Sequence, residues 1–181
     1  MGWGMESKIA LIYKSKYGST KKYANWLKEK LKCDIYEGNK VKIKELLKYD
    51  TIIYGGGIYM GKLNGFDLIK KNINKLSKKK IIVFAVGCSL ESEKNLNKIK
   101  KNNLQNGLDK DIKLFYFRGG LDFKNLKFCD KMALKLFRNT LVNKKEPLTE
   151  EERLILSYYE KAHDWTNENS LIPLIKYVNE K

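Results

Sequence analysis

The stretch IALIYKSKYGSTKKYANWLKEKL, residues 9–31, joins a short apolar run to a helix-like pattern through a loop rich in hydroxyl groups. The run at residues 8–13 is typical of a strand that is buried on both faces of a sheet. Residues 20–31 place Ala24 and Leu27 on one side and lysines on the other, which predicts an amphipathic helix. The stretch therefore predicts a strand, a loop and a helix, which is how a βαβ unit begins.

Strands and helices continue to alternate along the rest of the chain. Further strands are expected at residues 33–36, 51–54, 81–87 and 112–117. Helices are expected at residues 41–47, 66–76, 91–104 and 122–143. A further helix is expected to begin after Thr149, its N-cap, and a last one is expected at residues 169–181. Pro173 is tolerated in this last helix only because it lies near the start. This alternation favours a parallel sheet with right-handed crossovers. We therefore predict an α/β fold with a doubly wound, five-stranded parallel sheet and helices on both faces.

The expected domain organisation is a single domain over residues 1–181. Residues 1–7, MGWGMES, are interpreted either as a leader or as containing a non-native remnant, MGWG, before a natural start at Met5. They do not have the pattern of a signal peptide. Residues 120–148 are predicted to form an extra helical insertion after the fifth strand. No apolar run approaches the length that is needed to span a bilayer.

The composition restricts the classes of function. The chain has a formal net charge of +16, but only Arg118, Arg138 and Arg153 of its 37 basic residues are arginine. Nucleic-acid surfaces favour arginine, so a solvated lysine surface is the main interpretation, and anionic lipid is preferred to nucleic acid as an acidic partner. Since the chain has one histidine and three widely spaced cysteines, we expect no metal site.

The first loop has the chemistry of an anion site. Ser15, Ser19 and Thr20 surround Gly18 directly before the predicted helix. Backbone N–H groups at a helix N-terminus hold phosphate well, and hydroxyl groups add donors. The loop lacks both the GxxxxGK[ST] and the GxGxxG spacing, which argues against a triphosphate or a dinucleotide. It therefore indicates a site for one terminal phosphate, and a simple serine-rich helix cap is the alternative.

Two further loops should leave the same edge of the sheet. YGGGIYMGK, residues 54–62, has glycines that let a backbone approach a flat ligand, followed by Tyr59 and Met60 for stacking. The alternative is a plain glycine turn. VGCSLES, residues 86–92, contains Cys88, which is either a buried structural thiol or a neighbour of the ligand.

IALIYKSKYGSTKKYA and YDTIIYGGGIYMGK together resemble the flavodoxin-like family, which binds flavin mononucleotide (FMN). The resemblance implies the strand order 2-1-3-4-5 and FMN as the cofactor. It places FMN contacts at Ser15, Lys16, Tyr17, Gly18, Ser19 and Thr20, at Gly56, Gly57, Ile58, Tyr59, Met60 and Gly61, and at Gly87, Cys88 and Ser89. No residue stands out as a catalytic acid or base.

A narrower resemblance concerns FYFRGGLDFKNLKFCDKMALKLF, residues 115–137, and the Asp164-Trp165 pair. Both are similar to features of flavodoxin-like, quinone-dependent protoporphyrinogen IX dehydrogenases, which carry a helical insertion after the fifth strand. In this chain the insertion combines an apolar face with a basic stripe. The apolar face consists of Leu126, Cys129, Ala133, Phe137 and Leu141, and the basic stripe of Lys124, Lys127, Lys131, Lys135 and Arg138.

Two functions follow from these resemblances. One is an oxidoreductase that oxidises protoporphyrinogen IX with a quinone as acceptor. The other is an electron-transfer protein of the flavodoxin type, which relays electrons between protein partners without its own small-molecule substrate. We expect a cytoplasmic protein, and the basic stripe indicates either peripheral contact with an anionic membrane or an ordinary packed amphipathic helix.

Overall fold

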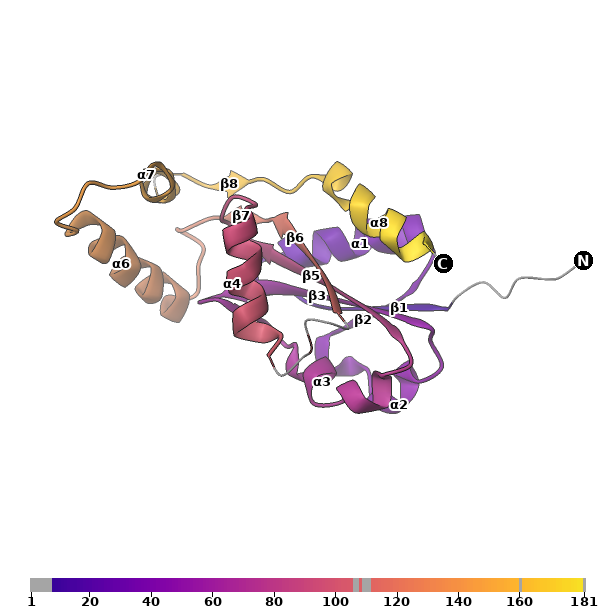
Figure 1. Ribbon diagram of the computed structural model, residues 1–181. Coiled ribbons are helices and arrows are strands. Elements are labelled where there is room, and N and C mark those ends of the chain that lie inside the picture. The colour runs from indigo at the N-terminus through magenta and orange to yellow at the C-terminus, as the bar shows by residue number, and fades with distance from the viewer. Residues whose placement is uncertain (1–7, 106–107, 109–111, 160, 181) are drawn as a thin grey trace, which may run out of the picture. The chain divides into compact units, whose positions relative to one another are not determined.

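A computed structural model describes residues 8–105, 108, 112–159 and 161–180 (Figure 1), so the expected leader at residues 1–7 lies outside the described residues. The chain divides into two compact units. We call the first the sheet unit; it contains the chain up to Gly119 and again from Thr166 onward. We call the second the inserted unit; it runs from Gly120 to Trp165.

The sheet unit is built on five parallel strands. Their spatial order is β2-β1-β3-β5-β6. The bounds are β1 Ile9–Lys14, β2 Asp34–Glu37, β3 Thr51–Tyr59, β5 Lys80–Gly87 and β6 Ile112–Arg118. A short strand, β4 (Lys62–Leu63), pairs antiparallel with the end of β3. Counted along the chain, the five parallel strands have the predicted order 2-1-3-4-5, so the predicted fold class is confirmed.

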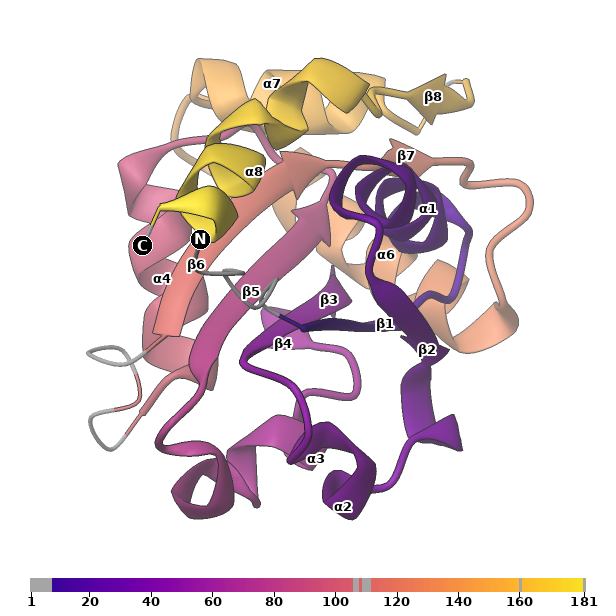
Figure 2. The same cartoon turned by 90° about the vertical axis from the view of Figure 1, so that its right-hand side faces the viewer.

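Helices cover both faces of this sheet (Figure 2). One face carries α1 (Ser19–Leu31), η3 (Glu168–Leu171) and α8 (Ile172–Asn179). The other carries α2 (Ile43–Leu46), α3 (Asp67–Lys70), η2 (Ile73–Leu76) and α4 (Glu93–Asn103), and η1 (Gly38–Lys40) follows β2. Successive residues of a strand serve opposite faces: Leu11 packs with Leu27 of α1, and Ile12 packs in the core that contains Leu46 and Ile99.

Two predicted helices differ from the observed ones for local reasons. The helix expected at residues 66–76 is broken into α3 and η2 at Asn72, whose side-chain amide donates to the Leu68 carbonyl at 2.9 Å. The helix expected from residue 122 begins only at Phe128, because the Asp122 carboxylate accepts hydrogen bonds from the Lys124 N–H and the Asn125 amide. Short polar side chains that bond to nearby groups in this way compete with helix formation.

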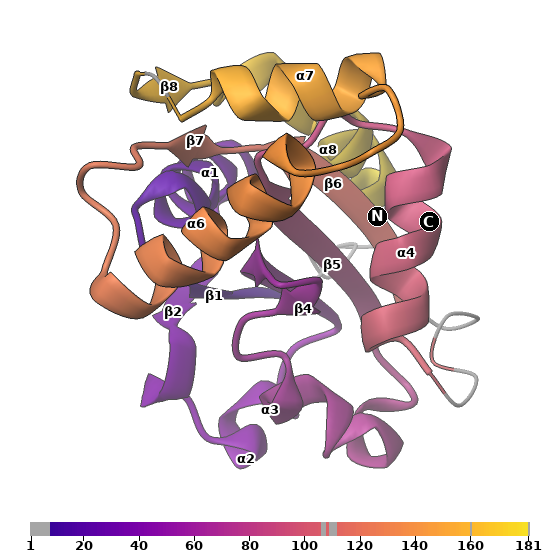
Figure 3. The ribbon, with the colours of Figure 1, turned by 90° about the vertical axis from the view of Figure 1, so that its left-hand side faces the viewer.

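Figure 3 shows the helices and short strands of the inserted unit. The strands β7 (Gly120–Leu121) and β8 (His163–Asp164) pair antiparallel, and α6 (Phe128–Val142) and α7 (Glu150–Ser157) lie between them in the chain. The predicted N-cap of α7 is confirmed, since Thr149 and Glu152 form a capping box. The insertion predicted at residues 120–148 is part of this unit, which continues to Trp165.

Each unit contains an aromatic cluster with one tryptophan. In the sheet unit, the ring of Trp26 lies edge-on to Tyr23, with 5.3 Å between centroids. In the inserted unit, Trp165 stacks on His163 at 4.7 Å and contacts Tyr158 at 4.5 Å. These clusters supply apolar area and ring contacts on which the packing of each unit depends.

Candidate functional site

The carboxyl ends of the central strands are aligned across the sheet. Lys14 at the end of β1 pairs with Gly56 of β3, and Gly87 at the end of β5 pairs with Arg118 of β6. From β1 the chain goes to β2 on one side, and β3 then pairs with β1 on the other side. The strand order therefore reverses between β1 and β3. Doubly wound sheets bind their ligands beside such a reversal, so the topology supports the predicted place of the site.

The first predicted loop, residues 15–18, leads directly into α1. Gly18 is the N-cap residue with φ +100°, a left-handed value that favours glycine, and it gives the helix no side-chain cap. The Gly18 N–H donates to the Ser15 hydroxyl at 3.1 Å, which closes the loop. The first turn of α1 contains no acidic residue, so no carboxylate of that turn competes with a bound anion. This donor set fits a phosphate group.

Thr20 is buried in the first turn of α1, with 3% of its surface exposed. It is one of the few polar residues that the described part of the chain buries so deeply. Lys16 and Tyr17 lie in the loop before it, and Tyr17 is 37% exposed. The loop thus combines a buried hydroxyl side chain with an accessible aromatic ring.

The second predicted loop is shorter than the sequence indicated. Gly55, Gly56 and Gly57 lie inside β3 and are buried. A Cβ atom on Gly55 would lie 2.0 Å from Cζ of Phe84, and one on Gly56 would lie 2.9 Å from the Asn64 carbonyl oxygen. Gly55 and Gly56 therefore lie within the strand and not in a loop, and they are needed for close packing inside the sheet unit. The contact of Gly56 with FMN stays a prediction.

The actual turn consists of Met60 and Gly61, between β3 and β4. Their φ values are +49° and +79°, and positive values at both central residues are typical of a tight hairpin. Met60 is 89% exposed. Of the predicted contact residues in this segment, only those from Ile58 onward are more than slightly accessible.

Asn103 of α4 holds this hairpin, a role that sequence reasoning missed. Its side-chain oxygen accepts a hydrogen bond from the Leu63 N–H at 2.8 Å, and its amide donates to the Gly61 carbonyl at 3.0 Å. Asn103 is 7% exposed. The available signal was the position of Asn103, four residues after Ile99 and so on the same, buried side of the helix.

Aromatic rings from the first two loops lie close together. The centroids of Tyr17 and Tyr59 are 6.1 Å apart with 60° between the ring planes. The Lys16 ammonium group lies 5.6 Å from the Tyr17 centroid and 5.3 Å from that of Tyr59, within the range of cation–π interaction. The structure therefore brings the phosphate-type loop and the hairpin together, as predicted, with two aromatic faces between them.

The third loop is fastened to β6. The Ser89 carbonyl accepts a hydrogen bond from the Tyr116 hydroxyl at 2.8 Å, and the Gly87 carbonyl accepts one from the Gly119 N–H at 2.7 Å. Burial raises the pKa of Cys88 to about 11, so its thiol is protonated at neutral pH. Cys88 therefore lacks the thiolate character of a catalytic nucleophile.

Gly119 is a second residue that sequence reasoning missed. A Cβ atom on Gly119 would lie 3.2 Å from the Ser19 Cβ and 2.9 Å from Val86. The end of β6 therefore passes directly beside the first turn of α1. The Arg118-Gly119-Gly120 triplet after an apolar strand was the signal that could have indicated it.

FMN fits these residues as a ligand. The first loop and the start of α1 supply donors for a single phosphate, and Tyr17 and Tyr59 supply faces for a flat ring. Burial raises the pKa values of Tyr54 and Tyr116, whose hydroxyls donate to the Asn64 and Ser89 carbonyls. These two hydroxyls therefore position the loops rather than supply an acid or a base.

Comparisons with known proteins agree with this fit. A family model described as flavodoxin domain matches residues 10–147. An uncharacterised protein of Methanocaldococcus jannaschii is 37% identical over 81 residues, which cover 43% of this chain and 53% of that protein. This match thus spans about half the length of that relative.

Two of the solved structures that are similar to this chain illustrate the likeness. One is a WrbA-like flavodoxin from Agrobacterium tumefaciens, with 18% identity, 72% of this chain and 92% of that chain covered, and a TM-score of 0.42. The other is the two-electron reduced flavodoxin of Megasphaera elsdenii, which is 14% identical. The match covers 60% of this chain and 82% of that chain, with a TM-score of 0.42.

Proposed function

Because the chain belongs to the flavodoxin domain family and its cofactor is accordingly FMN, we propose that it is an oxidoreductase that passes electrons from protoporphyrinogen IX to a quinone. Bound FMN would supply the redox chemistry of this reaction. The first loop would hold its phosphate through Ser15 and the first turn of α1. Tyr17 and Tyr59 would orient the flat ring and shield it from water.

The inserted unit is the observation that carries the enzymatic proposal. A protein that only relays electrons needs little beyond the sheet unit, whereas a large apolar donor needs additional binding surface. The inserted unit supplies such surface: Phe128, Met132 and Leu136 of α6 are 77%, 41% and 62% exposed. They recur at every fourth residue and so lie on one side of the helix.

The same helix supports contact with an anionic membrane, where quinones dissolve. Lys131 and Lys135 lie in α6 among these exposed apolar residues. Apolar and cationic side chains on one helix are typical of interfacial helices. Within the described residues, no helix is both long and apolar enough to cross a bilayer, so the proposed contact is peripheral.

The test mixes FMN-loaded protein with protoporphyrinogen IX and a soluble menaquinone analogue under anaerobic conditions. Each oxidation of the donor by two electrons reduces one quinone to quinol, which takes up the protons that the donor loses. Conversion of protoporphyrinogen IX to the fluorescent porphyrin removes six electrons and six protons, so we expect one porphyrin to appear for every three quinols formed. Protein without FMN is the control, and an equal rate in that control would contradict the proposal.

The second candidate is electron relay between proteins. It is favoured by the sheet unit, which contains all three predicted FMN loops without any residue of the inserted unit. This function predicts fast reduction of the bound flavin by a flavodoxin reductase and no reaction with protoporphyrinogen IX. Stopped-flow absorbance with each donor distinguishes the two candidates.

A further inference from the structure

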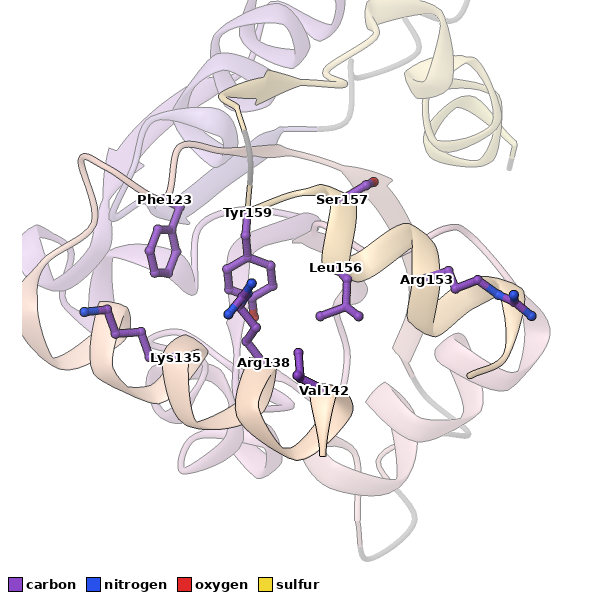
Figure 4. A pocket seen from close by; sticks show the side chains of 8 residues that line it. All are labelled: Phe123, Lys135, Arg138, Val142, Arg153, Leu156, Ser157 and Tyr159. Carbon is purple, nitrogen blue, oxygen red and sulfur yellow. The ribbon is translucent and has the colours of Figure 1, made fainter. Parts of the chain in front are cut away.

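The inserted unit contains a groove between α6 and α7 (Figure 4), and its lining includes none of the predicted FMN contact residues. Its volume is about 480 Å³, and every residue that lines it belongs to the inserted unit. Lys135, Arg138 and Val142 of α6 line one wall, and Arg153 and Leu156 of α7 line the other. These spacings of three and four residues place the side chains of each helix on one face.

The charge of the groove is one-sided. Two of the three arginines of the chain, Arg138 and Arg153, line it together with Lys135, and no carboxylate does. The nearby Glu152 is bound by the Lys144 ammonium group at 2.9 Å and by its own helix cap. Arginine binds carboxylates through two parallel hydrogen bonds, so its presence in a lysine-rich chain indicates recognition of a planar anion.

The rest of the lining is apolar and aromatic. The rings of Phe123 and Tyr159 are 5.1 Å apart with 60° between their planes. The Tyr159 hydroxyl donates to the Leu134 carbonyl at 2.9 Å, which fixes the ring at the groove. In Figure 4 the side chain of Arg138 lies beside this ring, and Leu156 and Val142 lie next to it. A ligand that contacts these side chains needs an apolar body, preferably a ring.

From the position of Arg138 beside the Tyr159 ring, in a groove that Lys135 and Arg153 also line, we propose that the groove between α6 and α7 binds an aromatic carboxylate. The carboxylate pairs with Arg138, and the ring of the ligand lies against Phe123, Tyr159 and Leu156. A neutral aromatic compound would leave the arginines unpaired, and a small inorganic anion would leave the apolar wall uncovered. The proposal concerns residues of the inserted unit alone and does not depend on the proposed redox reaction.

The test uses the full chain saturated with FMN, so that the flavin site is not available to the probe. Biphenyl-4-carboxylate is titrated by isothermal calorimetry into the wild type, Arg138→Gln and Lys145→Gln. Lys145 is an exposed lysine of the same unit that does not line the groove, so its variant removes the same charge elsewhere. We expect saturable binding to the wild type and to Lys145→Gln, and at least tenfold weaker binding to Arg138→Gln.

The neutral analogue biphenyl-4-carboxamide separates ion pairing from apolar contact. We expect it to bind more weakly than the carboxylate and to be indifferent to Arg138→Gln. Circular dichroism and FMN content confirm that each variant is folded. Three outcomes would overturn the proposal: no saturable binding to the wild type, equal binding to Arg138→Gln, or equal losses in both variants, which would reflect only the net charge of the chain.

Discussion

Gly55 shows how strongly a single residue can be fixed by its neighbour across the sheet. It is buried in β3 opposite Phe84 of β5, with which it is paired in the ladder. The Phe84 ring lies over Gly55 and occupies the place where a side chain would be. Phe84 itself is wholly buried and contacts Phe117, so the ring has little room to move.

We therefore expect Gly55→Ala to destabilise the sheet unit. Its Cβ would lie 2.0 Å from the Phe84 ring, and overpacking of this kind costs roughly 1–3 kcal/mol in free energy of unfolding. Urea denaturation followed by circular dichroism measures this loss. Adding Phe84→Leu to Gly55→Ala should recover part of it, because the ring that clashes is gone. Additive losses in the double variant would contradict the packing explanation.

Thr20 allows a test of the phosphate site. If its hydroxyl contacts the FMN phosphate, Thr20→Ala should weaken FMN binding by about 1 kcal/mol, or roughly fivefold in Kd, the typical value of one hydrogen bond. Quenching of flavin fluorescence measures Kd. Riboflavin, which has no phosphate, is the matched ligand and should bind both proteins equally. An equal loss for riboflavin would mean that Thr20 only supports the helix.

At the scale of elements, the ends of helices and strands depend on a few polar residues. Helix α7 begins at Thr149, whose hydroxyl accepts a hydrogen bond from the Glu152 N–H at 3.2 Å, while the Glu152 carboxylate accepts one from the Thr149 N–H at 2.8 Å. The Lys144 ammonium group and the Thr149 N–H lower the pKa of Glu152. The cap therefore persists at neutral pH and weakens as acid protonates this carboxylate.

Removing this cap should loosen α7. We expect Thr149→Ala to destabilise the inserted unit by about 1 kcal/mol, the usual cost of losing an N-cap. Hydrogen exchange of the α7 amides, measured by mass spectrometry, should become faster by the factor that corresponds to this loss of free energy. Thr149→Ser keeps the hydroxyl and should exchange as the wild type does. Equal exchange in all three proteins would show that the cap contributes nothing measurable.

The sequence predicted elements best where one strong local pattern decided them. The apolar runs that became β1 and β5 were placed within one residue of their observed ends, and Thr149 marked the start of α7. The length of β3 was missed, because glycines normally indicate a turn and only the Phe84 ring explains why they continue the strand. Local propensity carries no information about that distant ring.

The candidate site was predictable to a similar degree. Its first loop could be found because hydroxyl residues before a helix have a direct chemical meaning. Asn103 and Gly119 were missed, because they act on the hairpin and on the first turn of α1 from segments far away in the sequence. The residues next to them gave only a weak signal of these tertiary contacts.

At the scale of the whole molecule, the chain enters and leaves the inserted unit through two paired strands. Gly120 of β7 lies opposite Asp164 of β8 in the ladder, and paired residues of antiparallel strands have Cα atoms about 5 Å apart. The two ends of the inserted unit can therefore be joined by a short linker.

We expect a variant in which two glycines replace residues 120–165 to keep FMN affinity and to lose oxidation of protoporphyrinogen IX. The reason is that all predicted FMN contacts lie in the sheet unit, whereas Phe128, Met132 and Leu136, the exposed residues proposed for the donor, lie in α6. Fluorescence titration with FMN and the porphyrin assay measure the two properties. A folded variant that still oxidises the donor would contradict the role given to the inserted unit.

The two aromatic clusters give this chain a built-in pair of optical probes. Trp26 packs against Tyr23 in the sheet unit, and Trp165 stacks on His163 in the inserted unit. When Trp3 and one of these two are replaced by phenylalanine, the remaining indole reports on one unit only. Unfolding of the sheet unit and of the inserted unit can thus be followed separately by tryptophan fluorescence, without any attached dye.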